Sequence, residues 1–277
     1  LQKAIDLGYV KVTIDAPVES VKEMEDQLKQ TFHLKEVFVS PNLVDDEEIN
    51  LRDTCRALAG NLDKYIIDNT VVAVSWGNTL NCLAGQIQPL KAKDIKVVQL
   101  NGGVAKSASS TGASQIVDAL TMAGHGIGYM FPVPAIVDSK HTSEILQEET
   151  QVKNVLRLAK EAEVSIFSIG ALSKDSILYE VEYLKDEDFQ ALEKNKAVGD
   201  IASRYFDING NIALKELDDR VVGFGLEELR EKEWTIAIAV GVNKVDAIIG
   251  ALRAGFMNVL YTDEKTAREI LNRNLPG

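Results

Sequence analysis

The feature that most constrains the fold is a series of short, almost uninterrupted apolar runs that alternate with segments of helical periodicity. Four of these runs occupy residues 71–75, 95–100, 164–170 and 234–241. A strand that is apolar on both faces is typical of a parallel sheet covered by helices on both sides, because a sheet face open to water alternates polar and apolar residues. The sequence therefore predicts an α/β fold built on a mostly parallel sheet with helices on both faces.

The segments between these runs complete the alternation. Helices are expected over 16–34, 45–66, 112–123, 141–163 and 243–255, and further strands over 35–40 and 125–134. No internal repeat and no proline- or serine-rich linker marks a boundary between these elements. We therefore expect one α/β domain.

Composition and charge exclude several classes of protein. Hydrophobic residues make up 45% of the chain, but no apolar run reaches the ~20 residues that a membrane-spanning helix needs. No signal peptide is evident, and Cys55 and Cys82 lack a metal-type spacing, so we expect a cytoplasmic protein with reduced thiols and no bound metal. The alternative is a secreted protein held by one disulfide. The formal charge of −12 opposes binding to a phosphate backbone, so these residues alone are a poor nucleic-acid binder.

Glycine stands at the ends of four predicted strands. The positions are Gly77, Gly102 with Gly103, Gly170 and Gly241. Ligands of parallel sheets bind at the carboxyl ends of the strands, where the following helices present free N–H groups. Because glycine lets the backbone approach a ligand closely, we expect these strand ends to converge on a binding site.

The stretch Gly77-Asn78-Thr79 joins a predicted strand to a predicted helix. Its successive backbone N–H groups, together with the Thr79 hydroxyl, would form a cradle for an anion. The alternative is that Asn78 or Thr79 only caps the helix. No GxxxxGK[ST] motif is present, and no GxGxxG motif follows a strand, so the nucleotide-binding fingerprints are absent.

Two charged residues are candidates beside this cradle. Lys244 opens the helix after the run 234–241, where a cation is unfavourable unless an anion lies nearby; the alternative is a solvated surface lysine. Asp200 lies among small and apolar residues, where its carboxylate could accept hydrogen bonds from sugar hydroxyls or cap a turn. After it, Asn209-Gly210 predicts a hairpin turn rather than a calcium loop.

Nucleophilic catalysis finds no support in the sequence. The three histidines, His33, His125 and His141, form no pattern with a serine or cysteine nucleophile, and no GxSxG motif occurs. We therefore predict no catalytic residues. A sugar isomerase, which needs only a carboxylate base and a positioned acid, is not excluded by this test.

Several motifs together resemble one bacterial family. They are "LQKAIDLGYVKVTIDAP", "VVAVSWGNTL", "VVQLNGG", "AVGDIASRYFDINGN", "RVVGFGLEELR" and "NKVDAIIGALRAGFMNVLYTDEKTAREIL", which together extend over nearly the whole chain. In this combination and order they resemble the effector-binding domain of the SorC/DeoR-type sugar-binding transcriptional regulators. The resemblance implies a Rossmann-like sheet similar to glucosamine-6-phosphate deaminase, ribose-5-phosphate isomerase and CoA-transferases.

The resemblance also implies a domain organisation and partners. Residues 1–15 would be a remnant of an N-terminal helix-turn-helix DNA-binding domain with its linker, and residues 16–277 the effector-binding and oligomerisation domain. The expected partners are a phosphorylated sugar effector and operator DNA, the latter contacted only through the N-terminal domain. A homodimer or homotetramer is expected, because an operator with two half-sites is bound by two DNA-binding domains related by symmetry. The resemblance implies no cofactor, no membrane and no enzymatic activity.

Site residues follow from the same resemblance. The family's phosphate loop matches Gly77, Asn78 and Thr79, and its phosphate-contacting lysine matches Lys244. The acidic residue that contacts sugar hydroxyls matches Asp200. The turn that selects the effector matches Asn101, Gly102 and Gly103.

Two positions depart from the family pattern. A member of the family that holds deoxyribose 5-phosphate as a Schiff base has lysine where Asn101 stands, and an amide cannot form an imine because that reaction needs an amine nucleophile. Reversible binding is therefore expected here, with Asn101 hydrogen-bonded to a hydroxyl or carbonyl oxygen. Asn78 replaces a second hydroxyl residue of the phosphate loop. The rival function is a sugar-phosphate isomerase or deaminase of the same fold, since fold alone does not determine function.

Overall fold

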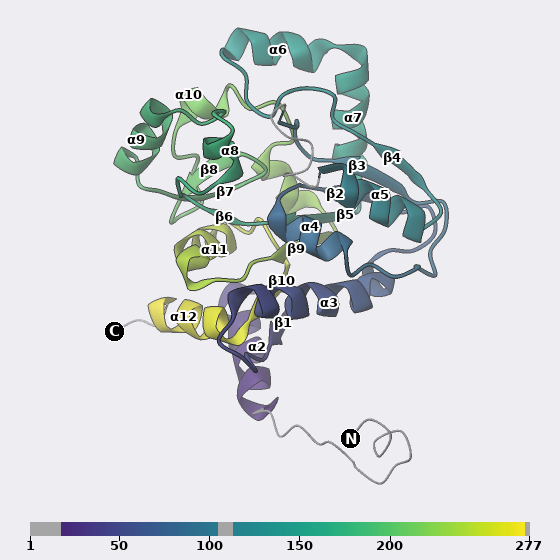
Figure 1. Ribbon diagram of the computed structural model, residues 1–277, viewed down its shortest axis with the longest axis vertical. Coiled ribbons are helices and arrows are strands. Elements are labelled where there is room, and N and C mark those ends of the chain that lie inside the picture. The colour runs from purple at the N-terminus through teal and green to yellow at the C-terminus, as the bar shows by residue number, and fades with distance from the viewer. Residues whose placement is uncertain (1–17, 105–112, 275–277) are drawn as a thin grey trace.

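The computed structural model describes residues 18–104 and 113–274 (Figure 1). Residues 1–15, expected to be a remnant of an N-terminal DNA-binding domain with its linker, lie outside this range. Within it, the predicted helices and strands are present, but the strand expected over 125–134 is limited to Ile127–Tyr129. The predicted α/β fold is confirmed.

The main sheet has seven strands, and every neighbouring pair is parallel. From one edge to the other they are β1 (Glu36–Ser40), β10 (Val259–Asp263), β9 (Trp234–Ile238), β5 (Val164–Ser168), β2 (Val71–Val74), β3 (Lys96–Gln99) and β4 (Ile127–Tyr129). The central strands are buried along almost their full length. This burial is why they appear in the sequence as continuous apolar runs.

Helices cover both faces of this sheet. The larger ones are α2 (Val18–Phe32), α3 (Glu47–Tyr65), α4 (Asn78–Ala84), α5 (Ala113–Ala123), α6 (Lys140–Glu148), α7 (Thr150–Glu161), α11 (Val245–Arg253) and α12 (Glu264–Asn274). The apolar sides of α3, α4 and α5 form one hydrophobic cluster with one face of the sheet. Those of α2, α7, α11 and α12 form a second cluster with the opposite face.

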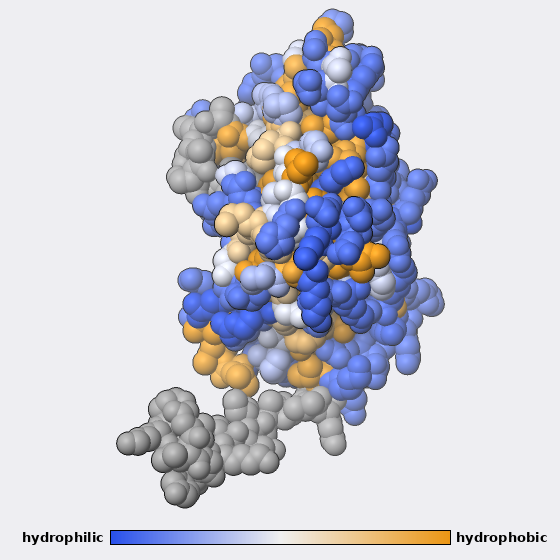
Figure 2. All heavy atoms as spheres, turned by 90° about the vertical axis from the view of Figure 1, so that its right-hand side faces the viewer, coloured by the Kyte–Doolittle hydropathy of each residue, from blue (hydrophilic) through white to orange (hydrophobic). Residues whose placement is uncertain are grey.

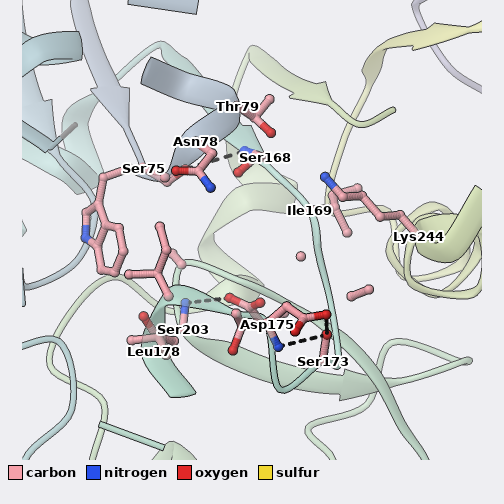
Figure 3. A pocket seen from close by; sticks show the side chains of 18 of the residues that line it. Ser75, Asn78, Thr79, Ser168, Ile169, Ser173, Asp175, Leu178, Ser203 and Lys244 are labelled. Carbon is pink, nitrogen blue, oxygen red and sulfur yellow. Dashed lines mark hydrogen bonds between the residues drawn. The ribbon is translucent and has the colours of Figure 1, made fainter. Parts of the chain in front are cut away.

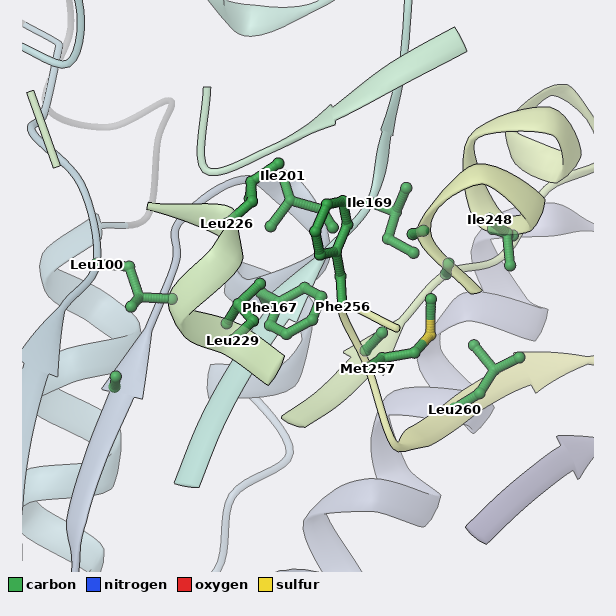
Figure 4. Packing of buried hydrophobic residues seen from close by; sticks show 14 of the residues in the cluster. Leu100, Phe167, Ile169, Ile201, Leu226, Leu229, Ile248, Phe256, Met257 and Leu260 are labelled. Carbon is green, nitrogen blue, oxygen red and sulfur yellow. The ribbon is translucent and has the colours of Figure 1, made fainter. Parts of the chain in front are cut away.

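Aromatic side chains fill the second cluster (Figure 4). Phe167 on β5 is fully buried, and Phe206 and Phe256 meet edge to face with their ring centroids 5.8 Å apart. Such pairs add about 1 kcal/mol to the burial of apolar area. Leu226 and Leu229 come from a short 3₁₀ helix, η1 (Leu226–Glu231), which closes this side of the core.

A smaller antiparallel sheet continues from the carboxyl end of β5. It consists of β6 (Gly170–Ala171), β7 (Ala197–Ile201) and β8 (Arg204–Asp207), with three short helices nearby, α8 (Ile177–Glu180), α9 (Asp186–Lys194) and α10 (Lys215–Asp218). These elements have a hydrophobic cluster of their own. Nothing in the apolar pattern predicts this sheet, because its strands are short and only partly buried.

The predicted turn through Asn209 and Gly210 is confirmed. Gly210 has a φ of 79°, and the Asp207 carboxylate accepts hydrogen bonds from the backbone N–H groups of Asn209 and Asn211. This Asx-type arrangement stabilises the turn. Across the described residues, no helix combines the length and the apolar character needed to cross a bilayer.

Candidate functional site

A pocket of about 290 Å³ lies at the carboxyl ends of β2 and β5, between the main sheet and the small sheet (Figure 3). Its walls come from the strand-to-helix corner 75–79, from the segment 168–178 and from the turn 200–203. Asn101, Asn243 and Lys244 complete the lining. The carboxyl ends of parallel strands are the expected position for a ligand in such a fold.

Gly77, Asn78 and Thr79 form one wall of this pocket. Helix α4 begins at Asn78, and its cap residue is Gly77, whose φ of 134° favours glycine. No side chain caps this helix, so the alternative in which Asn78 or Thr79 only caps it is wrong. The first N–H groups of a helix have no intrahelical acceptor, which leaves the backbone of this corner available to an acceptor in the pocket.

Lys244 supplies the cation of the pocket. It ends a short 3₁₀ helix, η2 (Val242–Lys244), directly before α11, and in Figure 3 its amine is directed toward the pocket. Burial lowers the pKa of Lys244, while the nearby carboxylates of Glu47 and Asp200 raise it. Among the described residues, Lys244 has no ion pair or hydrogen bond through its amine. It is therefore not the solvated surface lysine of the alternative interpretation.

Asp200 lies on β7, opposite Gly170 of β6. One carboxylate oxygen accepts the backbone N–H of Ser203 at 3.0 Å, and the other lies where a Cβ on Gly170 would come within 2.3 Å of it. Burial raises the pKa of Asp200 to about 6, against opposing effects of the Ser203 N–H and of Lys244. Gly170 is therefore needed to make room for this carboxylate rather than for a ligand.

Asn101 and Ser203 meet at the side of the pocket where β7 turns into β8. The Asn101 amide nitrogen donates to the Ser203 hydroxyl at 3.0 Å, and the amide oxygen is buried without a partner among the described residues. Ala202 and Ser203 form the two-residue turn, with φ values of 51° and 70° that favour glycine or asparagine. Strained turns of this kind occur preferentially where a ligand binds.

Gly102 and Gly103, in contrast, do not line this pocket. A Cβ on Gly102 would lie 2.4 Å from the carbonyl oxygen of Pro134, and Gly103 forms a β-bridge with the same residue. The Gly102 carbonyl accepts the indole N–H of Trp76 at 2.8 Å. Gly102 therefore serves the packing of the chain against residues 133–134, which the spacing in the sequence could not reveal.

Gly241 also lies outside the pocket. Its φ is 119°, and it borders a separate cavity of about 40 Å³ together with Glu47 and Asp263. The expectation that all four glycine-bearing strand ends converge is therefore wrong for Gly102, Gly103 and Gly241. Gly77 and Gly170 are the two strand-end glycines that line the site.

The segment 168–178 contributes polar side chains that the sequence did not single out. Ser173 donates to the Asp175 carboxylate at 3.3 Å, and both line the pocket on the side opposite Asn78 and Thr79 in Figure 3. Ser168 and Ser176 add hydroxyl groups. The only feature of the sequence that could have indicated these lining residues is the number of serines directly after a buried strand.

Two thiols lie beneath the corner at Thr79. The buried Cys55 of α3 donates to the Thr79 carbonyl at 3.7 Å. A hydrogen bond with Cys55 lowers the pKa of Cys82 to about 7, and the same contact together with burial raises the pKa of Cys55.

Within the described residues, no group of three or more acidic, histidine or cysteine side chains is placed to hold a metal ion.

The raised pKa of Asp200 predicts a pH dependence of stability. Between the ordinary carboxyl pKa of 3.8 and about 6, the folded chain holds a proton on Asp200 that the unfolded chain has released. Stability from this group is therefore present at low pH and is lost as the pH rises to 6, by up to about 1.4 kcal/mol per pH unit. Asp200→Asn, which mimics the protonated form, should lack this loss in urea unfolding between pH 4 and 7.

The matched control is Asp138→Asn, which removes an acidic side chain that is 98% exposed. Its unfolding free energy should follow the wild-type curve across the same pH range. An Asp200→Asn curve parallel to the wild-type curve would contradict the assigned environment of this carboxyl group.

Comparison with known proteins identifies the family. The family model Sugar-bind, described as "Putative sugar-binding domain", matches residues 16–272. The chain belongs to this sugar-binding domain family. The deoxyribonucleoside regulator of Bacillus subtilis (strain 168) is 32% identical over 272 residues, which cover 98% of this chain and 87% of that protein. The transcriptional regulator LsrR of Escherichia coli (strain K12) is 31% identical over 278 residues, which cover 98% of this chain and 84% of that protein.

Solved structures agree with this assignment. A DeoR family transcriptional regulator from Listeria monocytogenes superposes with a TM-score of 0.83 at 26% identity, covering 91% of this chain and 99% of that chain. The full-length sorbitol operon regulator SorC from Klebsiella pneumoniae shares the fold, with a TM-score of 0.87 at 23% identity over 98% of this chain and 87% of that chain. The sugar-binding domain described here is thus of the kind found in bacterial transcriptional regulators.

Proposed function

We propose that the pocket binds a phosphorylated sugar reversibly and that this binding controls operator recognition by a separate N-terminal helix-turn-helix domain. The observation that carries the proposal is the placement of Lys244, a partly buried amine without an ion-pair partner among the described residues, in one pocket with the corner 77–79. A desolvated cation is unfavourable alone, so a bound anion would relieve its cost. Phosphate also accepts hydrogen bonds from backbone N–H groups.

The other side of the pocket suits a sugar. Asp200 and Asp175 offer carboxylate acceptors, and Ser173 and Ser203 offer hydroxyl groups. Asn101 adds an amide whose oxygen lacks a partner among the described residues. Sugar hydroxyls both donate and accept, and they match such a mixed lining. A pocket of about 290 Å³ fits a ligand the size of a monosaccharide phosphate.

Binding at this site would be non-covalent. Asn101 supplies no amine, and we assign the amine of Lys244 to the phosphate. Treatment of the complex with borohydride should therefore add no sugar mass to the protein.

A mechanism for control follows from the position of the pocket. Its phosphate side, with Gly77 and Lys244, belongs to the main sheet, and its sugar side, with Asp200 and Ser203, belongs to the small sheet. A ligand that touches both would favour one arrangement of the two sheets. Only such a difference in affinity between two arrangements can change the geometry of attached DNA-binding domains.

The proposal predicts that the phosphate dominates recognition. In calorimetric titrations of pentose, hexose and triose phosphates against their unphosphorylated counterparts, at least one phosphorylated member should bind about 100-fold more tightly than its counterpart. The double variant Thr79→Ala, Lys244→Ala should lose that preference. Equal binding of both forms would contradict the assignment of the site, and turnover of a sugar phosphate that Asp200→Asn abolishes would favour an isomerase or deaminase instead.

A further inference from the structure

Two cysteine thiols are reactive groups that the proposed function leaves unused. Figure 2 shows a face of the molecule on which apolar atoms come to the surface between hydrophilic ones. The thiols lie instead where α3 packs against α4, with Cys55 fully buried and Cys82 half-buried beside the same hydrophobic cluster. These 277 residues contain no third cysteine. Two thiols within one helix contact can be oxidised to a disulfide, which gives this contact a chemistry of its own.

The packing of α3 against α4 brings the two sulfur atoms together. The Cys55 thiol donates to the Thr79 carbonyl, in the first turn of α4, at 3.7 Å. Cys82 comes three residues after Thr79 and therefore lies on the same face of that helix. The two thiols are hydrogen-bonded to each other. From such a contact, a small displacement brings the sulfurs to the disulfide bond length of about 2.05 Å.

The surroundings of the two thiols give them different roles. The hydrogen bond from Cys55 and the nearby Arg52 of α3 lower the pKa of Cys82 to about 7, against burial and the carboxylate of Glu48. Near neutral pH much of Cys82 is therefore thiolate, which is the form that reacts with peroxides. The same hydrogen bond and burial raise the pKa of Cys55, against the opposing effect of Lys244. Cys82 is thus the first nucleophile, and Cys55 holds its proton until the second step.

We propose that Cys82 is a site of oxidation by hydrogen peroxide and that Cys55 is its resolving thiol, so that a disulfide forms between α3 and α4. In the first step, the Cys82 thiolate attacks one peroxide oxygen and the O–O bond breaks. The sulfur becomes a sulfenic acid, and the other oxygen leaves as hydroxide, which takes up a proton to form water. In the second step, the Cys55 sulfur attacks the Cys82 sulfur, the S–S bond forms and the S–O bond breaks. The departing hydroxide leaves as water with the Cys55 proton, so two thiols and one peroxide give one disulfide and two waters.

The disulfide acts on the corner of the candidate site. Its formation removes the S–H group that Cys55 donates to the Thr79 carbonyl, and it draws α4 toward α3. Gly77 is the cap residue of α4, Asn78 and Thr79 begin its first turn, and all three line the pocket. The oxidised chain should bind the phosphorylated sugar about 10-fold more weakly or worse, because hydrogen bonds from backbone N–H groups to an anion depend steeply on distance and angle. This consequence rests on the proposed function, whereas formation of the disulfide does not.

The first test is mass spectrometry of the 277-residue chain after treatment with hydrogen peroxide and alkylation of the remaining thiols in denaturant. The wild type should lose two hydrogen atoms and take up no alkyl group, and dithiothreitol should restore both thiols. Cys55→Ser should stop at a sulfenic acid on Cys82, which dimedone traps. Cys82→Ser should leave the fully buried Cys55 reduced at the same peroxide concentration.

Three outcomes of this test would overturn the proposal. They are a wild type that keeps two alkylatable thiols, a disulfide that joins two chains instead of Cys55 to Cys82, and a Cys55 that is oxidised in Cys82→Ser as fast as Cys82 is in the wild type. Because the wild-type result is read directly, the proposal remains testable even if Cys55→Ser does not fold.

The role of the neighbouring cation is tested by the rate of oxidation at pH 7. Arg52→Gln should slow the oxidation of Cys82 by a factor of about 3, because it removes a charge that favours the thiolate. The matched control is Arg56→Gln on the same helix, whose side chain is 63% exposed and pairs with Asp53. It should leave the rate unchanged. Equal slowing in both variants would overturn the assignment of Cys82 as a thiolate activated by Arg52.

The link to the pocket is tested on the oxidised and the reduced chain side by side. The amides of residues 77–83 should exchange hydrogen at different rates in the two forms, and calorimetry should show the loss of affinity for the phosphorylated sugar. Unchanged exchange together with unchanged affinity would overturn the link. A reduced chain that binds no phosphorylated sugar would count against the proposed function, while mass and hydrogen exchange would still decide whether the disulfide forms and displaces the corner.

Discussion

Replacing Lys244 by methionine should weaken the binding of the phosphorylated sugar effector by about 100-fold or more. Truncating one partner of a desolvated charge pair costs about 2–5 kcal/mol, because the other charge then remains buried and unpaired, and 100-fold corresponds to about 2.8 kcal/mol. The bound phosphate would be that second charge, with only the backbone N–H groups near Gly77 left to stabilise it. Calorimetric titration of Lys244→Met with the effector and with its unphosphorylated counterpart measures this loss.

The free variant should fold at least as stably as the wild type. Burial lowers the pKa of Lys244, which means that the charged amine is destabilised in the folded chain when no anion is bound. A methionine side chain at this position has no charge and avoids this desolvation cost. Loss of binding with an unchanged or raised melting temperature would therefore isolate the phosphate contact from unfolding.

Lys91→Met is the matched control, since the Lys91 side chain is 90% exposed and lies outside the pocket. Binding to this variant should equal wild-type binding. If both variants lost the same amount of binding affinity, the loss would be explained by the change in the net charge of the protein rather than by a contact of Lys244 with the phosphate. A Lys244→Met chain that binds the effector normally would remove the basis for the phosphate assignment.

The main sheet could be predicted from the sequence because its strands are buried on both faces. Runs such as 164–170 and 234–241 contain few polar residues, which is typical of strands in a covered parallel sheet. The small sheet escaped prediction for the opposite reason. β6 has two residues, and β7 alternates between half-buried and buried positions around Asp200, so neither gives a clear apolar period.

The candidate site could be predicted in part. Strand ends identified the corner at Gly77–Thr79, and the start of a helix identified Lys244, because these features are local in the sequence. Gly102 and Gly103 share that local signal, yet both lie next to Pro134, which is more distant in the sequence and belongs to the segment after β4. A glycine that makes room for a ligand and a glycine that makes room for another backbone segment cannot be distinguished in the sequence.

The raised pKa of Asp200 and the unpaired amide oxygen of Asn101 depend on burial that only tertiary structure creates. Ser203, which donates its backbone N–H to Asp200 and accepts from Asn101, connects these two side chains. No spacing rule relates three residues of which the first lies about a hundred positions before the others. This polar connection is the part of the site that sequence patterns could not supply.

Gly199→Ala should destabilise the chain by about 3 kcal/mol and also reduce effector binding. A Cβ at this position would lie 2.0 Å from the carbonyl oxygen of Gly170 and 2.5 Å from the Cβ of Ala247. The first of these neighbours is backbone, so β6 and β7 would have to separate, and overpacking of this kind costs 1–3 kcal/mol or more. Asp200 follows directly on β7, so its carboxylate would shift with the strand. Urea unfolding measures the stability and calorimetry the binding.

Gly103→Ala is the control variant for Gly199→Ala. A Cβ on Gly103 meets no atom within 4 Å, and Gly103 lies outside the pocket although its position in the sequence suggested a ligand contact. This variant should keep wild-type stability and wild-type affinity. If Gly103→Ala lost effector binding while Gly199→Ala kept it, the effector would contact the turn at 101–103 rather than the small sheet that carries Asp200. The assignment of the effector to this pocket would then be wrong.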